Sequence, residues 1–251
     1  MSSMWQDLEL LVLVKTYPHP SLSHREVVCT AGMTHDSRWI RLYPVDYRYR
    51  PYREWFKKYE WIRVKARKHS RDQRPESYQP DPSFSIERLR YASSANGWKE
   101  RKQIVFGHPV ISMCALKRMP PSEKSLALVK PKEVIDLRIE ADAPTWKARH
   151  LCLFQQLRLF GPEQRPLEKI PWRFSYFYFC AEENCLGHKQ VILDWEIFEL
   201  FRKQRDKSGE ERAKQAVVEN FKDQMCAADR DVHFFVGTIF KKRAWVVLGV
   251  F

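Results

Sequence analysis

Residues 9–45 decide the fold, and they read ELLVLVKTYPHPSLSHREVVCTAGMTHDSRWIRLYPV. Three apolar runs within this stretch, at residues 9–18, 26–33 and 38–45, have the composition and length of β-strands. The linkers HPSLSHR and THDS are short and contain the Pro, Ser and Asp residues that favour turns. Strands of this length joined by such short turns predict an antiparallel meander.

The strand pattern continues beyond this stretch. Residues 61–68, WIRVKARK, alternate apolar and basic side chains, which predicts one buried face and one basic face. In residues 38–45, RWIRLYPV, one face of the strand carries Ile40, Leu42 and Pro44 and the other carries Trp39, Arg41 and Tyr43. We therefore expect Arg41 on an exposed face between aromatic rings. Residues 86–91 and 110–116 predict further strands, and together these segments predict a small antiparallel β-barrel.

Two consecutive prolines, at positions 120 and 121, mark the best candidate for a domain boundary. We therefore predict a basic β-barrel-like domain over residues 1–120 and an α+β domain over residues 121–251, which makes the chain α+β as a whole. The elements expected in the second domain are strands at 125–140, 172–179, 232–240 and 244–251, and helices at 145–159 and after Asp194.

The composition favours a polyanionic partner. The chain of 251 residues has 44% hydrophobic residues, enough for a sizeable core, and carries a net charge of +13. That charge favours nucleic acid, DNA or RNA, ahead of an anionic membrane surface. The sequence has no phosphate-binding loop, no dinucleotide-binding glycine pattern and no G-x-S-x-G elbow, which argues against nucleotide hydrolases and α/β-hydrolases.

The compartment predicted from the sequence is the cytoplasm. No apolar run approaches the roughly 20 residues that cross a bilayer, so we expect no membrane span. The run of residues 10–14 lies between Glu9 and Lys15 and lacks the flanks of a signal peptide. The six cysteines are spread over a chain too long to need disulfide bridges, which is typical of reduced proteins.

A basic, aromatic-rich segment lies at residues 35–74. It contains thirteen Lys and Arg against five Asp and Glu, with nine aromatic residues between them. Cationic side chains neutralise phosphates and exposed rings stack on bases, so the segment predicts a nucleic-acid-binding surface. The alternative is that the rings pack in the barrel core while the cations only solvate a strand face. The candidate contact residues are Arg41, Arg48, Arg50, Arg53, Lys57, Lys58, Arg63, Lys65 and Arg67, with Tyr47, Tyr49 and Tyr52.

A second candidate site lies in the segment FCAEENCLGHK. Cys180, Cys185 and His188 have C-x4-C-x2-H spacing around Asn184 and Gly187, which are turn formers. Thiolate and imidazole groups are the ligands of structural zinc, but such a site needs four of them. The candidates for the fourth ligand are His150, Cys152, Cys226 and His233, and the spacing does not choose among them.

Other interpretations of this segment stay open. Three protein ligands and a water would form a catalytic zinc site, with a nearby glutamate, Glu182, Glu183 or Glu196, as the base. The segment can also be an ordinary loop without metal. Cys29 and Cys114 lie in apolar runs, and we expect them to be core residues of strands.

Asp194 and Glu196, in the string LDWE, have two interpretations. Asp194 directly precedes an apolar helical pattern, which predicts that its side chain caps a helix. Glu196 would then lie in the first turn, where a negative charge is favourable. An Asp/Glu pair is also the kind of magnesium ligand that a metal-dependent nuclease or another nucleic-acid-processing enzyme uses.

Several strings resemble a family of uncharacterised bacterial proteins, and the similarity spans nearly the whole chain. These strings are VKTYPHPS, CTAGMT, WIRLYPV and RPESYQPD in the first half and CAEENCLGHK, LDWE and FFVGT in the second. The resemblance implies no activity and no catalytic residue. It implies an association with mobile elements and anti-phage defence genes, hence a sensor or targeting subunit that binds nucleic acid within a larger protein complex.

Overall fold

The computed structural model describes residues 4–120, 122–155, 166–240, 242 and 244–251. The chain divides into two compact units. The barrel unit comprises Met1–Pro109 and Trp146–Glu168, and the knuckle unit comprises Val110–Thr145 and Lys169–Phe251. No helix among the described residues has the length and hydropathy needed to cross a membrane.

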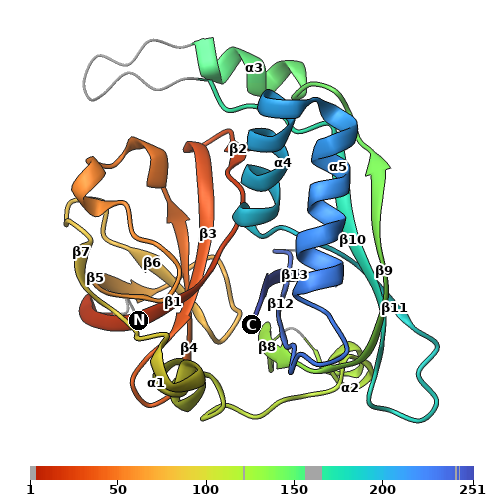
Figure 1. Ribbon diagram of the computed structural model, residues 1–251. Coiled ribbons are helices and arrows are strands. Elements are labelled where there is room, and N and C mark those ends of the chain that lie inside the picture. Colours follow the sequence, from red (N-terminus) through yellow and green to blue (C-terminus); the bar gives the residue numbers. More distant parts are fainter. Residues whose placement is uncertain (1–3, 121, 156–165, 241, 243) are drawn as a thin grey trace. The chain divides into compact units, whose positions relative to one another are not determined.

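The barrel unit is built on a closed β-barrel of five strands (Figure 1). The strands are β1 (Gln6–Lys15), β3 (Arg25–Met33), β4 (Trp39–Val45), β6 (Ser77–Pro80) and β5 (Glu60–Lys68), in that order around the barrel. Pairing of β1 with β5 closes it. The barrel is predominantly antiparallel, as the sequence predicted, and mixed in one place, because β4 and β6 are parallel while the other pairs are antiparallel.

Strand β1 contributes many of the buried apolar side chains of the barrel unit. Leu10, Leu11 and Leu13 are completely buried, as expected for an apolar strand that pairs on both sides. The approach of β3 to β1 depends on Gly32, because a Cβ atom there would lie 2.2 Å from the carbonyl oxygen of Leu11. The predicted alternation of β5 is confirmed, since Ile62, Val64 and Ala66 are buried while Arg63, Lys65 and Arg67 are exposed or half-buried.

Short elements surround this barrel. The strand predicted at residues 86–91 is confirmed as β7 (Glu87–Tyr91), which pairs with β5, and β2 (His19–Ser21) pairs with β3. The helical elements of the barrel unit are the 3-10 helices η1 (Tyr47–Tyr49) and η2 (Tyr52–Glu54) and the α-helices α1 (Ala95–Val105) and α3 (Ala148–Gln155). The helix predicted at 145–159 is confirmed over α3, and residues 156–159 lie outside the described residues.

The knuckle unit contains two antiparallel three-stranded sheets (Figure 1). One has the order β11 (His188–Val191), β10 (Trp172–Cys180), β9 (Pro131–Ala141). The other has the order β13 (Trp245–Val250), β12 (Phe234–Thr238), β8 (Leu126–Val129). The helices are α2 (Met113–Arg118), α4 (Trp195–Ser208) and α5 (Glu210–Val218), which continues into a π-helix, η3 (Glu219–Gln224). The α+β class predicted from the sequence is confirmed.

Aromatic side chains of β10 fill the core of the knuckle unit. Tyr176 stacks on Phe234 with 4.7 Å between ring centroids, and its hydroxyl donates to the carbonyl oxygen of Phe221 at 2.6 Å. Phe174 packs against Phe201 of α4 at 5.9 Å. The polar end of the buried tyrosine is thus satisfied, and its ring contributes packing as in any close-packed core.

The strand predicted at residues 110–116 is wrong. Only Val110 forms an isolated bridge, with Leu128, and helix α2 begins at Met113. The Ser112 hydroxyl accepts a hydrogen bond from the Ala115 amide at 3.0 Å, which caps the helix. This cap, which an apolar pattern does not reveal, places Cys114 in the first turn of a helix.

Candidate metal centre and basic surface

Four side chains of the knuckle unit converge on one point. Cys114 Sγ, Cys180 Sγ, Cys185 Sγ and His188 Nε2 all lie within 4.8 Å of one another. Cys180 Sγ is 3.6 Å from both Cys114 Sγ and Cys185 Sγ, and the nitrogen of His188 is 3.2–3.4 Å from each of the three sulfurs. These four residues can hold a metal ion.

The distances fit tetrahedral coordination. Zinc bonds of about 2.3 Å to sulfur and 2.0–2.1 Å to nitrogen place tetrahedral ligands about 3.8 Å apart for two sulfurs and about 3.6 Å apart for sulfur and nitrogen. The observed separations agree with these values to within about 0.4 Å. A disulfide is excluded for the contacts of Cys180, because its sulfur atoms would be about 2.05 Å apart rather than 3.6 Å.

A β-hairpin brings three of the ligands together. Cys180 is the last residue of β10 and His188 the first of β11, and Tyr178 is paired with His188 across the hairpin. Gly187 in the turn has φ +91°, and a Cβ atom there would lie 2.9 Å from Cζ of Phe177. Glycine is therefore favoured at this position by the left-handed backbone conformation, and any larger residue would also have to displace the ring of Phe177.

Glu182 connects the hairpin turn to helix α2, which carries the fourth ligand. Its carboxylate accepts hydrogen bonds from the Arg118 guanidinium at 3.0 and 3.1 Å and from the Ser112 hydroxyl. Arg118, followed by Ser112, holds the pKa of Glu182 below its ordinary value. Since Ser112 and Arg118 flank Cys114 at the two ends of the helix, this carboxylate positions Cys114 against the hairpin. Glu182, expected from the sequence as a possible base, is committed to these contacts.

The protonation states are compatible with metal binding. Burial lowers the pKa of His188 to about 4, so at pH 7 its imidazole is neutral, the form that binds metals. Burial, together with hydrogen bonds to the neighbouring thiols, raises the pKa of Cys114 to about 12. For Cys180, burial opposes ionisation, but hydrogen bonds to the backbone of Glu182 and Cys114 leave its pKa below the ordinary value. A bound cation deprotonates coordinating thiols outright.

None of the four residues proposed as the fourth ligand belongs to this cluster. The Cys226 thiol donates to the carbonyl oxygen of Phe221 at 3.2 Å, and Nδ1 of His233 contacts the carbonyl oxygen of Asp231 at 3.1 Å. His150 and Cys152 lie on α3 of the barrel unit, outside the knuckle unit. The prediction was wrong because it treated Cys114 as a core residue of a strand.

The capping role predicted for Asp194 is confirmed. Its carboxylate accepts a hydrogen bond from the backbone amide of Glu196 at 3.2 Å at the start of α4, and the residue is fully buried. Neither residue belongs to a group of possible metal ligands among the described residues.

The basic segment of residues 35–74 lies in the barrel unit, and several of its cations are committed to carboxylates. Arg48 donates to Glu26 at 3.0 Å. The buried Arg50 donates to Asp46 at 2.8 Å and to Glu54 at 2.9 Å. Such pairs neutralise charge within the protein and leave less of it for a partner.

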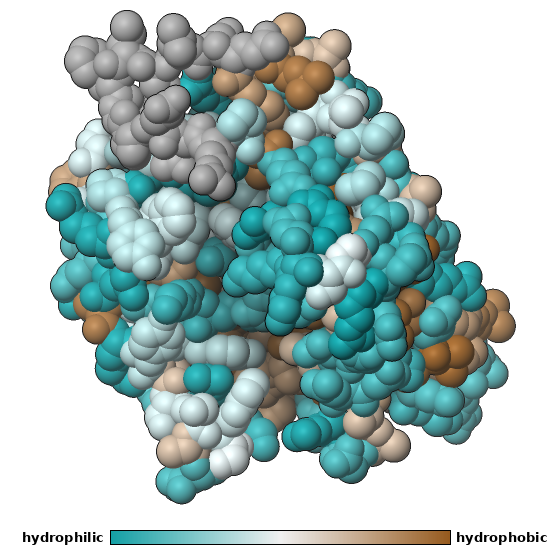
Figure 2. Space-filling model, turned by 45° about the horizontal axis from the view of Figure 1, so that its top comes forward, coloured by the Kyte–Doolittle hydropathy of each residue, from teal (hydrophilic) through white to brown (hydrophobic). Residues whose placement is uncertain are grey.

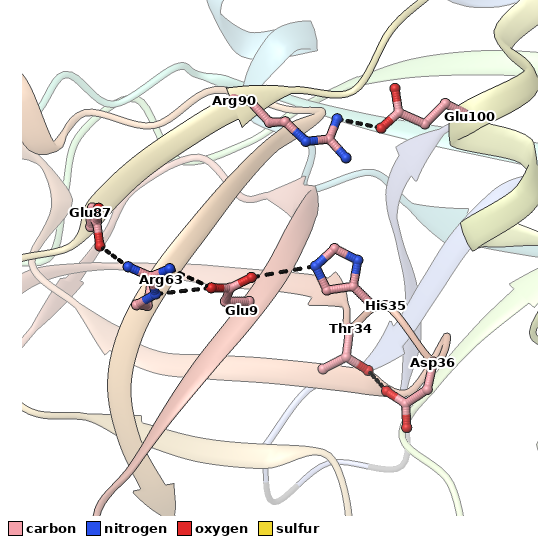
Figure 3. Close-up of polar contacts among 8 residues, drawn as sticks. All are labelled: Glu9, Thr34, His35, Asp36, Arg63, Glu87, Arg90 and Glu100. Carbon is pink, nitrogen blue, oxygen red and sulfur yellow. Dashed lines mark hydrogen bonds and ion pairs between the residues drawn. The ribbon is translucent and has the colours of Figure 1, made fainter.

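Figure 3 shows that a cation on the outer face of β5 is also paired with carboxylates. Arg63 bridges Glu9 and Glu87 with N–O distances of 2.7 and 2.6 Å, and Glu9 also contacts His35 at 3.4 Å. The ring of His35 stacks on Trp61 with centroids 3.8 Å apart. This face is basic in sequence but carries paired charges of both signs in the structure.

The prediction that Arg41 lies on an exposed face of its strand is wrong. Arg41 is 3% exposed and Trp39 is 5% exposed. The backbone amide of Arg41 donates to the carbonyl oxygen of Glu76, and burial lowers the pKa of the guanidinium. The charged groups of Asp72, Arg74 and Glu76 act on this guanidinium, so the segment before β6 lies close to the Arg41 side chain, and most residues of β4 are buried.

The other candidate contact residues differ in exposure. Tyr47 is buried and its hydroxyl donates to the carbonyl oxygen of Phe56 at 2.7 Å. Cations in contact with rings are Lys58 with Tyr59, Lys65 with Phe84 and Arg67 with Trp5, at 6.0, 4.0 and 4.5 Å from the ring centroids. Tyr52 is 78% exposed, and Arg53 and Lys57 beside it are also exposed.

Tyr49, the remaining candidate, lines a cavity of about 210 Å³ in the barrel unit. The cavity is formed by the turn before β3, by the connection from β4 through η1, and by the end of β6. Its lining residues are His24, Arg25, Pro44, Asp46, Tyr49, Arg50, Gln79, Pro80 and Pro82. No sequence pattern predicts this cavity, because the three segments are brought together only by the folding of the barrel.

Comparison with known proteins identifies a family. A murine DNA-binding protein, solved in complex with double-stranded DNA, matches with 9% sequence identity over 98% of this chain and 93% of that chain. Its TM-score of 0.34 is too low to support an argument from its fold or function. No curated protein sequence matches the chain. Residues 6–107 match a domain of unknown function, DUF8758. Residues 109–251, more than half of the chain, match another, DUF8757, and the chain therefore belongs to the DUF8757 family.

Proposed function

We propose that this protein binds nucleic acid through residues of the barrel unit, namely the exposed Tyr52, Arg53 and Lys57 and the half-buried Arg25, which we together term the phosphate surface. The observation that supports it is the availability of these cations. None of the three has an ion-pair partner within the described parts of the chain, whereas Arg48, Arg50 and Arg63 are paired.

Charge and exposure support the same surface. Residues 6–107 contain 20 Lys and Arg against 12 Asp and Glu, a net charge of +8 out of +13 for the whole chain. The 78% exposed ring of Tyr52 can stack on a base beside the two cations that follow it. On the face shown in Figure 2, hydrophilic residues predominate and apolar residues form separate groups. These features favour a polyanion over an apolar partner.

The test is the salt dependence of binding to labelled oligonucleotides. Three phosphate contacts give a slope of log K against log salt of about −2 for single strands and about −3 for duplexes. The double variant Arg53→Gln/Lys57→Gln leaves one of the three contacts and reduces the slope to about −1. Lys203→Gln/Lys207→Gln, which removes two exposed cations of α4 in the knuckle unit, is the matched control and should leave the slope unchanged.

Two results would contradict the proposal. One is an affinity that does not change with salt, because phosphate contact would then not be the mechanism. The other is an equal loss of affinity in both double variants, because net charge rather than this surface would then govern binding. A role as a sensor or targeting subunit of a defence-type assembly stays a prediction from the sequence.

We further propose that the metal of the Cys114, Cys180, Cys185 and His188 cluster is zinc and that its role is structural. Three cysteines and one histidine are a zinc ligand set, and four protein ligands leave no open position for water or substrate. A metal-dependent nuclease needs such a position, so this geometry favours the binding function over the enzymatic alternative.

A further inference from the structure

The cavity of the barrel unit has the volume of a site for one small group. Its volume of about 210 Å³ is below the roughly 300–1,000 Å³ of cavities that enclose drug-sized ligands. Three separate connections of the barrel form its walls, all attached to strands of the closed sheet. A site supported in this way is held in shape by the barrel rather than by one loop.

We propose that this cavity takes a single unstacked base of a nucleic-acid strand, with the adjoining phosphate on Arg25. The inference rests on the proposed nucleic-acid binding and adds the form of the substrate. A base in the cavity must be unstacked from the neighbouring bases of its strand. The preferred ligand is therefore a single strand, or a strand that contains an unpaired nucleotide.

The walls of the cavity suit the faces of a base. The ring of Tyr49 lies on one of the lining segments, and Pro44, Pro80 and Pro82 supply rigid apolar surface. Aromatic rings stack on bases of any sequence because every base has a π-face. Small-molecule sites are typically lined by apolar and aromatic side chains, together with a few placed polar groups that fix the orientation of the ligand.

The polar groups of the cavity suit the edge of a base. Gln79 offers an amide donor and an amide acceptor, and the carboxylate of Asp46, whose side chain is 49% exposed, offers acceptors. Arg50 donates to Asp46 at 2.8 Å and to Glu54 at 2.9 Å, which fixes the position of the Asp46 carboxylate. Base edges are recognised by such fixed donors and acceptors.

Arg25 supplies the charge for a phosphate. It lies at the start of β3 with φ +61°, a left-handed conformation that costs about 1–2 kcal/mol in a residue with a Cβ atom. Pairing of Ser21 with Arg25 and the hydrogen bond from the Glu26 amide to the His24 carbonyl oxygen at 2.8 Å hold the turn. Strained backbone of this kind is concentrated at ligand sites. Arg25 has no ion-pair partner in the part of the chain that the structure describes.

The test compares three labelled ligands of equal length by fluorescence anisotropy: a single strand, its duplex, and an abasic strand that keeps the phosphates. We expect the single strand to bind more tightly than the duplex and the abasic strand. Tyr49→Leu and Gln79→Leu should each weaken single-strand binding. For Tyr49→Leu the expected loss is roughly 5- to 160-fold, the range that corresponds to about 1–3 kcal/mol for one stacked base. Both variants should bind the abasic strand as the wild type does. Gln73→Leu, an exposed glutamine of the same unit, is the control.

The outcomes separate the two proposals. Absence of binding to all three ligands overturns the proposed function itself. Salt-dependent binding with equal affinity for all three ligands, unchanged in Tyr49→Leu and Gln79→Leu, leaves that function intact and overturns the base site. A 5′-mononucleotide that binds more tightly than the single strand also overturns it, because the cavity would then serve a free nucleotide.

Discussion

Replacing Cys114 by serine should abolish stoichiometric zinc binding, although Cys114 lies outside the C-x4-C-x2-H segment. Its sulfur is 3.6 Å from Cys180 Sγ and 3.4 Å from His188 Nε2, which makes it the fourth corner of the tetrahedron. Cys152→Ser and Cys226→Ser are matched controls, because these cysteines lie outside the cluster. Both controls should keep one zinc per chain.

The size of the effect follows from the loss of one of four ligands. Removing a residue that only supports a ligand weakens metal binding by about 10- to 100-fold, so removing a ligand should reach at least the upper end of that range. A 100-fold loss of affinity corresponds to about 2.7 kcal/mol of stability under saturating zinc. This value is a lower limit, because abolished binding removes the whole stabilisation by zinc. At about 2–4 °C per kcal/mol for a chain of this size, the Tm should fall by at least about 5 °C.

The assay combines metal analysis with thermal unfolding in the presence and absence of EDTA. EDTA should lower the Tm of the wild type and of both controls, and should have no further effect on Cys114→Ser. This pattern does not depend on how much the serine itself destabilises the fold. One zinc per chain in Cys114→Ser, or a wild-type Tm that EDTA leaves unchanged, would refute the assignment.

Three further predictions concern single residues. Glu182→Gln should weaken zinc binding by about 10- to 100-fold in a chelator competition, because the charged clamp on α2 is lost while all four ligands remain. Gly187→Ala should lower the free energy of unfolding by at least 1–2 kcal/mol in urea, because φ is +91° and Phe177 occupies the space; unchanged stability would contradict the geometry. Burial raises the pKa of Glu26 from 4.5 to about 7 against the opposing charge of Arg48, so its contribution to stability is complete below pH 4.5 and is lost as pH rises through 7. Wild type should therefore lose roughly 3 kcal/mol relative to Glu26→Gln between pH 4 and 8, and parallel pH profiles would show that this carboxylate is not the cause.

The strands of the barrel could be predicted because their apolar pattern is local. In β5, Ile62 and its apolar neighbours are buried while Arg63 is exposed, as alternation requires. The same pattern predicted an exposed Arg41 in β4, but this side chain is buried. Alternation identifies two different faces of a strand, but whether the polar face is exposed depends on segments far along the chain, here the residues before β6.

The metal site could be predicted only in part for a similar reason. Cys180, Cys185 and His188 lie within one hairpin, so their spacing carries the information. Cys114 is 66 residues before Cys180, in a short helix. The apolar run that contains this helix resembles a strand, so the pattern does not reveal the helix. The Ser112 cap was the available signal, but a single serine before an apolar run has low specificity.

Net charge overestimates the surface available to a phosphate, and Arg50 shows why. Its guanidinium is buried and donates to the carboxylates of Asp46 and Glu54. Transferring Arg50 to a phosphate would leave the buried Glu54 unpaired, at a cost of about 3–5 kcal/mol. A hydrogen bond to a charged group returns only about 1.5–3 kcal/mol. The paired arginines of the barrel unit therefore stabilise the fold, and the proposed contact with nucleic acid would fall to cations without carboxylate partners among the described residues, such as Arg25 and Arg53.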